Sequence, residues 1–308
     1  MKERKNIAFA SEGFLCKGWL YLPSHASASH PVPAVIMAHG FSLVKEAYLD
    51  RYAEVFCEAG LAVFVFDYRN FGESEGDHRQ HLDPHQQIED YRNAISWVSA
   101  VKEIDKEKIG IWGTSYSGGH VLHIAAIDKR VKAVVSQVPT INGWRSAERK
   151  NGPEKMKGLI GNLIQDRESR YQTGVQQYIQ VVSNDGTPAA QPHPECYKWF
   201  MGTKEAAAPN WENKITLQSM EKYLEYNPAG LIDLISPTPL LMIVAMDDKI
   251  TPPDMAIEAF ETRAKKPKAI VKLRGGHFDV YNGETFSEAS GAAAHWFARH
   301  LKESPIPI

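Results

Sequence analysis

Short apolar runs alternate with helical patterns along most of this chain, and this alternation restricts the possible fold more than any other feature. The pairs of apolar run and following helical pattern are 34–38 with 48–59, 61–66 with 84–98, and 109–112 with 117–127. Strands joined by crossover helices pair in parallel, because each helix returns the chain to the same edge of the sheet. The pattern therefore predicts an α/β fold with a mostly parallel sheet flanked by helices.

The two ends of the chain extend this pattern and the middle interrupts it. The remaining elements that we expect are a hairpin at 6–10 and 14–22, strands at 131–135, 240–245 and 269–273, and helices at 253–264 and 286–301. Between them, about a hundred residues are rich in charge, Gln, Pro and scattered aromatics without comparable apolar runs. We predict a core formed by residues 1–138 and 237–308, and an inserted helical lid at 139–236.

Composition narrows the classes of partner. Lys and Arg number 35 against 37 Asp and Glu, a net charge of -2, so no basic field attracts nucleic acid. The three cysteines, Cys16, Cys57 and Cys196, form no CxxC pair, which favours a reducing, cytoplasmic setting. No apolar run approaches the length that crosses a bilayer. We expect a soluble protein with neither nucleic-acid nor membrane partners; the oligomeric state stays open, a homodimer included.

A candidate nucleophile follows the strand at 109–112. The sequence Gly113-Thr114-Ser115-Tyr116-Ser117-Gly118-Gly119 leads from that strand into a helix, the context of a nucleophile elbow. The pattern G-x-S-x-G identifies Ser115 as the nucleophile, with Ser117 in place of the second Gly. This replacement keeps a small side chain but loses the backbone freedom of glycine at positive φ. In the alternative frame, Ser117 would be the nucleophile, deeper in the helix.

A serine nucleophile needs a base and a group that orients the base. His277 follows the strand at 269–273, and Asp248 follows the strand at 240–245, so both come at the carboxyl ends of strands. We predict that His277 exchanges protons with Ser115 and that Asp248 fixes its tautomer. Asp247 is the alternative acid; if it does not orient the histidine, it would be a solvated loop charge or a cap.

The remaining site residues concern the oxyanion and the substrate. Backbone N–H groups of Tyr116, after the nucleophile, and of Phe41, in the loop after the strand at 34–38, are the predicted donors to a tetrahedral oxyanion. His39 is predicted to be a supporting loop residue. The aromatic side chains of the lid would give the substrate an apolar wall, with Trp144 nearest Ser115. The predicted substrate-binding residues are Trp144, Trp199, Trp211 and Tyr223.

The sequence contains little that indicates a metal or cofactor site. His78, His81 and His85, with Asp77 and Asp83 between them, lie in a polar loop and helix start without the fixed set of ligands that zinc needs. No G-x-G-x-x-G or Walker pattern is present. We therefore predict neither a metal nor a cofactor.

Taken together, these motifs resemble the α/β-hydrolase superfamily. The His39-Gly40 loop, the segment 67–74, the Ser115 elbow, the Asp248 turn and the His277 loop fall in the superfamily's order. The elbow is similar to those of cocaine-esterase and X-Pro dipeptidyl-peptidase relatives, and the length and lid resemble fungal polyketide transferases. The resemblance implies an eight-stranded sheet, no cofactor, and an acyl-enzyme cycle on esters, thioesters or amides.

The leading hypothesis is a serine hydrolase that cleaves a carboxylic ester or lactone of a small, partly hydrophobic substrate. Three alternatives stay open: an acyltransferase or thioesterase of polyketide type, a peptidase or amidase, and a small-molecule receptor on a hydrolase scaffold. The first two keep the same triad and differ in the group that attacks or leaves the acyl-enzyme. The complete set of Ser115, Asp248 and His277 argues against an inert scaffold.

Overall fold

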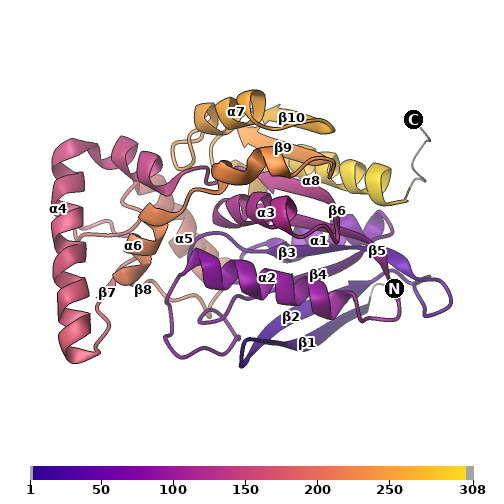
Figure 1. Cartoon of the computed structure of the whole chain (residues 1–308), viewed down its shortest axis with the longest axis horizontal. Helices are drawn as coiled ribbons and strands as arrows, with labels where there is room; N and C mark the ends of the chain where they lie inside the picture. The colour runs from indigo at the N-terminus through magenta and orange to yellow at the C-terminus, as the bar shows by residue number, and fades with distance from the viewer. Residues whose placement is uncertain (1–2, 303–308) are drawn as a thin grey trace.

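One mixed sheet of eight strands forms the centre of the molecule (Figure 1). The structure is a computed structural model, and it describes residues 3–302. The strand order is β1-β2-β4-β3-β5-β6-β9-β10; β2 pairs antiparallel with both β1 and β4, and the other neighbouring strands pair in parallel. The strands are β1 Glu3–Ser11, β2 Phe14–Leu22, β3 Val32–Ala38, β4 Ala62–Phe66, β5 Ile104–Thr114, β6 Val131–Gln137, β9 Leu240–Ala245 and β10 Lys268–Leu273. The architecture is the predicted α/β sheet with its antiparallel hairpin at one edge.

Helices cover both faces of this sheet, and in Figure 1 α2 and α3 lie in front of it while α1 and α8 lie behind. The helices of the core are α1 Leu49–Glu58, α2 Pro84–Val98, α3 Tyr116–Ile127, α7 Pro253–Thr262, α8 Gly283–Phe297 and the short turns η2 Asp279–Tyr281 and η3 Ala298–Lys302. Helix α2 begins as the sequence predicts: the side chain of Asp83 accepts from the His85 amide, and Pro84 occupies the first turn. Parallel strands covered on both faces explain their nearly continuous apolar sequences.

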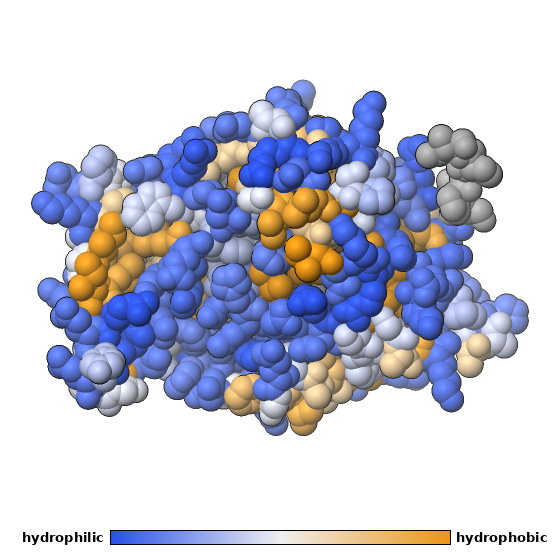
Figure 2. Space-filling view, viewed as in Figure 1, coloured by the Kyte–Doolittle hydropathy of each residue, from blue (hydrophilic) through white to orange (hydrophobic). Residues whose placement is uncertain are grey.

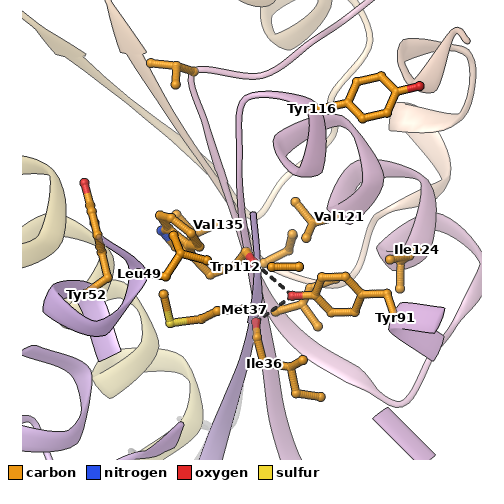
Figure 3. Close-up of a cluster of buried hydrophobic side chains, with 14 of the residues drawn as sticks. Ile36, Met37, Leu49, Tyr52, Tyr91, Trp112, Tyr116, Val121, Ile124 and Val135 are labelled. Atoms are coloured by element: carbon orange, nitrogen blue, oxygen red, sulfur yellow. Dashed lines mark hydrogen bonds between the residues drawn. The ribbon is translucent and has the colours of Figure 1, made fainter. Parts of the chain in front are cut away.

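Large aromatic side chains fix the two central strands, β3 and β5, from both faces (Figure 3). The Tyr91 hydroxyl lies 2.5 Å from the carbonyl oxygen of Ile36 and 2.9 Å from that of Trp112, so α2 contacts both strands. On the other face, the rings of Trp112 and Tyr52 have centroids 4.7 Å apart. Each buried aromatic side chain contributes roughly 4–6 kcal/mol of hydrophobic free energy. The carboxyl ends of β3 and β5 are therefore rigid supports for the loops that follow.

A mainly helical insertion lies between β6 and β9, and α4 stands at the far left of Figure 1, away from the sheet. Its elements are α4 Gly143–Thr173, β7 Tyr178–Ile179, α5 Pro194–Ala206, β8 Ile215–Thr216, α6 Gln218–Glu225 and η1 Pro228–Leu234. Helix α4 is broken at Gly152, whose φ of 72° is outside the helical range, and Pro153 follows directly. The paired strands β7 and β8 have two residues each and give no pattern that a sequence could reveal. Within residues 3–302, no helix combines the length and apolar character needed to cross a bilayer.

Candidate active site

Ser115 occupies the sharp turn between β5 and α3. Its backbone has φ 57° and ψ −113°, a strained conformation for a residue with a side chain. Its amide donates to the Gln137 carbonyl at 2.9 Å, and its own carbonyl accepts from the Thr140 amide at 2.9 Å. Strand β6 and the chain beyond it thus hold the turn in place. Strain retained by surrounding hydrogen bonds is typical of a functional position.

Glycines allow the chain to pass closely around this turn. A Cβ atom at Gly113 would lie 2.1 Å from the Ser117 carbonyl oxygen, so the start of α3 fits only against a glycine. A Cβ atom at Gly40 would lie 3.1 Å from that of Ser115, which shows how closely the loop after β3 approaches. Ser117 lies in α3 and has no positive φ; the positive φ belongs to Ser115. The expected backbone cost of Ser in place of the second Gly is therefore absent.

The Ser117 hydroxyl has a structural partner on each side. It donates to the His39 carbonyl at 2.6 Å, and the Tyr68 hydroxyl lies 2.6 Å from its oxygen. All three residues are buried. Because the Ser117 hydroxyl donates its one proton to the His39 carbonyl, the Tyr68 hydroxyl donates to Ser117. Ser117 thus ties the loop after β3 to helix α3.

A chain of hydrogen bonds joins Ser115 to two residues that are distant in sequence. His277 Nε2 lies 3.0 Å from Ser115 Oγ, and His277 Nδ1 lies 2.6 Å from Asp248 Oδ2. Asp248 Oδ1 accepts from the amides of Ile250 and Thr251. Burial would raise the pKa of Asp248, but the charge and hydrogen bond of His277 and the Thr251 hydrogen bonds outweigh it, so this pKa lies below its usual value. The carboxylate is thus ionised and directed at the imidazole.

The two neighbouring aspartates occupy different environments. Asp248 is buried, whereas Asp247 is exposed and its Oδ2 accepts from the Gly275 amide at 3.2 Å. The structure thus brings Asp248, and not Asp247, to His277. Thr251, which the sequence reasoning did not single out, lies 2.8 Å from Asp248 Oδ2 and 2.9 Å from the Val138 carbonyl through its hydroxyl oxygen. Its position three residues after an aspartate in a turn was the available signal.

The two predicted oxyanion residues lie beside Ser115. Tyr116 is the first residue of α3, and Phe41 follows Gly40, whose backbone packs on Ser115. Among residues 3–302, the Phe41 amide donates to no acceptor. The Phe41 ring packs edge-on against those of Tyr116 and Tyr223, at centroid distances of 5.7 and 5.8 Å. These contacts fix the loop without consuming its N–H group.

A narrow cavity opens at Ser115 and His277. Its walls are largely apolar, and the insertion contributes to them. The lining residues are Phe41, Leu43, Ser115, Gln191, Cys196, Phe200, Ile250, His277, Phe278 and Tyr281. The space left for a water-sized molecule is about 20 Å³, enough for roughly one water. A substrate larger than a water molecule therefore fits only if lining side chains move.

None of the four predicted substrate-binding aromatics lines this cavity. Trp144 is 44 % exposed and lies in an outer groove between α4 and α6, with Ile160 and Leu224, rather than near Ser115. Figure 2 shows apolar surface over α4 at its left side. The expectation failed for Trp144 because α4 turns this side chain outward, which its nearness to β6 in sequence could not reveal.

The other three aromatic side chains, Trp199, Trp211 and Tyr223, contact residues that line or flank the cavity. Trp199 stacks on Phe278 at a centroid distance of 4.5 Å, next to His277. Trp211 donates from Nε1 to the Ser42 carbonyl at 2.9 Å and so anchors the loop that contains Phe41. Tyr223 stacks on Tyr116 at 5.9 Å. The lining residues of the insertion are instead Gln191, Cys196 and Phe200, which are less conspicuous in the sequence than tryptophans.

Potential metal ligands are already engaged. Among the described residues, one group of three carboxylates, Glu46, Asp67 and Glu73, has the spacing to hold an ion. The Lys45 ammonium contacts all three at 2.6–2.8 Å and supplies the positive charge itself. His81 uses its Nδ1 in a contact with Thr216 Oγ1 at 2.8 Å.

Comparison with known proteins defines the class. The crystal structure of the α/β hydrolase GrgF from Penicillium sp. sh18 superposes with a TM-score of 0.83 at 29% identity, covering 98% of this chain and 100% of the other. A thiohydrolase of Eupenicillium brefeldianum is 30% identical, over 92% of this chain and 90% of that protein. The quorum-quenching protein AidA of Acinetobacter baumannii is 31% identical, over 91% and 90%. The chain has the α/β-hydrolase fold.

A match to a family model assigns the chain to one family within this fold. The model of the X-Pro dipeptidyl-peptidase (S15) family matches residues 13–279, and the chain belongs to this family. The predictions of an α/β-hydrolase fold and of a serine-dependent hydrolase are confirmed at the level of fold and family.

Proposed function

We propose that the protein hydrolyses a carboxylic ester or lactone of a small, partly hydrophobic molecule through an acyl-enzyme on Ser115. The observation that carries this proposal is the continuous chain of hydrogen bonds from Ser115 Oγ through His277 to Asp248, with distances of 3.0 and 2.6 Å. A serine hydroxyl becomes nucleophilic when a base is within about 3 Å and is held by a third group. An inert receptor would have no need of this arrangement.

The chemistry runs in two halves. Ser115 Oγ attacks the substrate carbonyl carbon while His277 Nε2 takes its proton, and the collapsing intermediate expels the alcohol with that proton. Water then attacks the acyl-enzyme, His277 takes a proton from the water, and it returns that proton to Ser115 as the acid leaves. Asp248 stabilises the imidazolium in both halves. Its low pKa keeps it ionised throughout.

Two backbone amides, those of Phe41 and Tyr116, are proposed to receive the negative oxygen. The unused Phe41 N–H and the contact between Gly40 and Ser115 support this assignment. One such donor contributes roughly 3–4 kcal/mol to transition-state stabilisation.

The insertion is proposed to act as a lid. Its residues Gln191, Cys196 and Phe200 line the cavity, which has room for roughly one water molecule. Opening of the insertion would admit the substrate, and closure would exclude bulk water. The three cysteines are buried thiols, which is consistent with the proposed cytoplasmic setting.

A thioester is the second candidate substrate, because the relative named thiohydrolase is 30% identical over 92% of this chain. The same triad serves, and only the leaving atom changes from oxygen to sulfur. A polyketide transferase of Penicillium sp, 31% identical over 92% of this chain, keeps transfer to another nucleophile open as well.

The test is a panel of short-chain p-nitrophenyl esters, lactones and acyl thioesters with the wild type and Ser115→Ala. We expect ester or lactone turnover that falls at least about a thousandfold in Ser115→Ala. The matched control is Ser117→Ala, which removes a hydroxyl two residues away and should keep turnover within about tenfold. Turnover that survives Ser115→Ala, or that occurs with thioesters alone, would refute the proposed substrate class or nucleophile.

A further inference from the structure

A lysine ammonium lies behind the cavity wall. Lys150, in the first half of α4, donates from Nζ to Gln191 Oε1 at 3.1 Å, and Gln191 lines the cavity beside Ser115. Among residues 3–302, no carboxylate lies within ion-pair distance of this ammonium. The nearby Asp248 is engaged with His277 and with two backbone amides.

The environment of Lys150 differs from that of a surface lysine. The residue is partly buried and lies two positions before Gly152, where α4 departs from helical geometry. Burial lowers the pKa of the Lys150 ammonium, although the Asp248 charge offsets part of this effect. A partly desolvated ammonium without a counter-ion is destabilised, and a ligand that supplies the opposite charge would reduce this cost.

Resting on the proposed function, we propose that Lys150 and Gln191 form a specificity site for a carboxylate on the acyl part of the substrate, so that the preferred substrates are half-esters of dicarboxylic acids. The ammonium attracts the carboxylate, and the Gln191 amide turns from Lys150 toward the bound group. The remaining cavity walls, including Phe200, Phe278 and Ile250, contact the methylene chain between the two ends. The site binds charge and performs no covalent step.

The same cation bears on the peptidase alternative. A substrate with a free amino terminus would bring a second positive charge toward Lys150, and like charges in a site of low dielectric repel strongly. The placement therefore disfavours cleavage of dipeptides from a free amino terminus, although the family model carries that activity in its name.

The chain offers a matched control. Arg149 is the neighbouring cation on α4, but it is exposed and pairs with Asp254 at 2.7 Å. Arg149→Met removes the same unit of charge one residue away, outside the cavity. Lys150→Met keeps the length and apolar stem of the side chain and removes its charge, and Lys150→Arg keeps the charge.

The experiment compares kcat/KM for the mono-p-nitrophenyl ester of glutaric acid with that for p-nitrophenyl pentanoate, a neutral ester of the same chain length. We expect the wild type to prefer the charged ester, the preference to fall about tenfold or more in Lys150→Met, and Lys150→Arg to keep most of it. Gln191→Glu should also abolish the preference, because the new carboxylate would form an ion pair with the Lys150 ammonium. Arg149→Met should change the preference less than twofold.

The outcomes separate the two proposals. Cleavage of both esters with a preference that Lys150→Met leaves unchanged would overturn the specificity site and leave the ester hydrolase standing. An equal loss in Arg149→Met would also overturn it, since the effect would then come from the general field of α4. Cleavage of neither ester by the wild type would overturn ester hydrolysis, and the specificity site with it.

Discussion

The Ser117 hydroxyl gives the sharpest test of how the elbow and the loop after β3 are joined. Tyr68 donates to Ser117, and Ser117 donates to the His39 carbonyl, with both distances 2.6 Å and all three residues buried. Ser117→Ala removes the middle member and leaves the Tyr68 hydroxyl and the His39 carbonyl without this partner. A buried polar group left unsatisfied costs about 1–3 kcal/mol. We expect Ser117→Ala to lower the free energy of unfolding by about 3 kcal/mol.

A double-mutant cycle isolates the reason. Tyr68→Phe removes the first donor but leaves the bond from Ser117 to His39, so it should cost only about 1 kcal/mol. In the double variant the Tyr68 hydroxyl is no longer orphaned, and the loss should be smaller than the sum by about 1–2 kcal/mol. Urea unfolding followed by tryptophan fluorescence measures all four free energies.

Activity gives the second measurement for the same variants. The loop that carries Phe41 loses a tether in Ser117→Ala, so we expect kcat to fall about tenfold while Ser115 stays reactive. Single-variant losses that add without coupling would show that Ser117 does not link Tyr68 to His39. A loss of activity in Ser117→Ala as large as in Ser115→Ala would contradict the assignment of Ser115.

Three further predictions concern acid and charge. Asp248→Asn should lower kcat by on the order of 10³–10⁴-fold, while Asp247→Asn should change it less than threefold; equal, mild losses would mean that the acid lies elsewhere. Burial lowers the pKa of His39 from 6.5 to about 4, so the free energy of unfolding should fall by about 3 kcal/mol as the pH drops from 6.5 to 4. In urea titrations of His39→Phe, the free energy of unfolding should change by about 3 kcal/mol less over the same pH range. Burial lowers the pKa of Lys150, so its ammonium should lose its charge, and the enzyme its preference for the charged ester, at a pH below the ordinary lysine value of 10.5. A preference that stays constant up to pH 10.5 would contradict this prediction.

The sequence predicted the elements of the core because their signals are local. An apolar strand followed by a small-residue turn and a helix describes Ser115 completely within a few positions. His277 and Asp248 likewise follow apolar strands directly, and parallel pairing brings such ends together. The chemistry at the strand ends could therefore be predicted without coordinates.

The insertion could not be predicted in this way. The direction of Trp144 depends on how α4 packs on α6, and the approach of Lys150 to Gln191 joins residues 41 positions apart that share no motif. The role of Ser117 depends on Tyr68, which lies in the loop after β4. Contacts between irregular segments depend on the tertiary packing of the whole domain. Aromatic content alone therefore indicated the wrong lining residues.

Reaction with a fluorophosphonate probe, followed by mass mapping of the labelled peptide, tests the activated alcohol most directly. We expect a single adduct on Ser115 that forms rapidly in the wild type and at least a hundredfold more slowly when His277 is replaced by Ala. An adduct on Ser117, or equal labelling rates with and without the imidazole, would contradict this expectation.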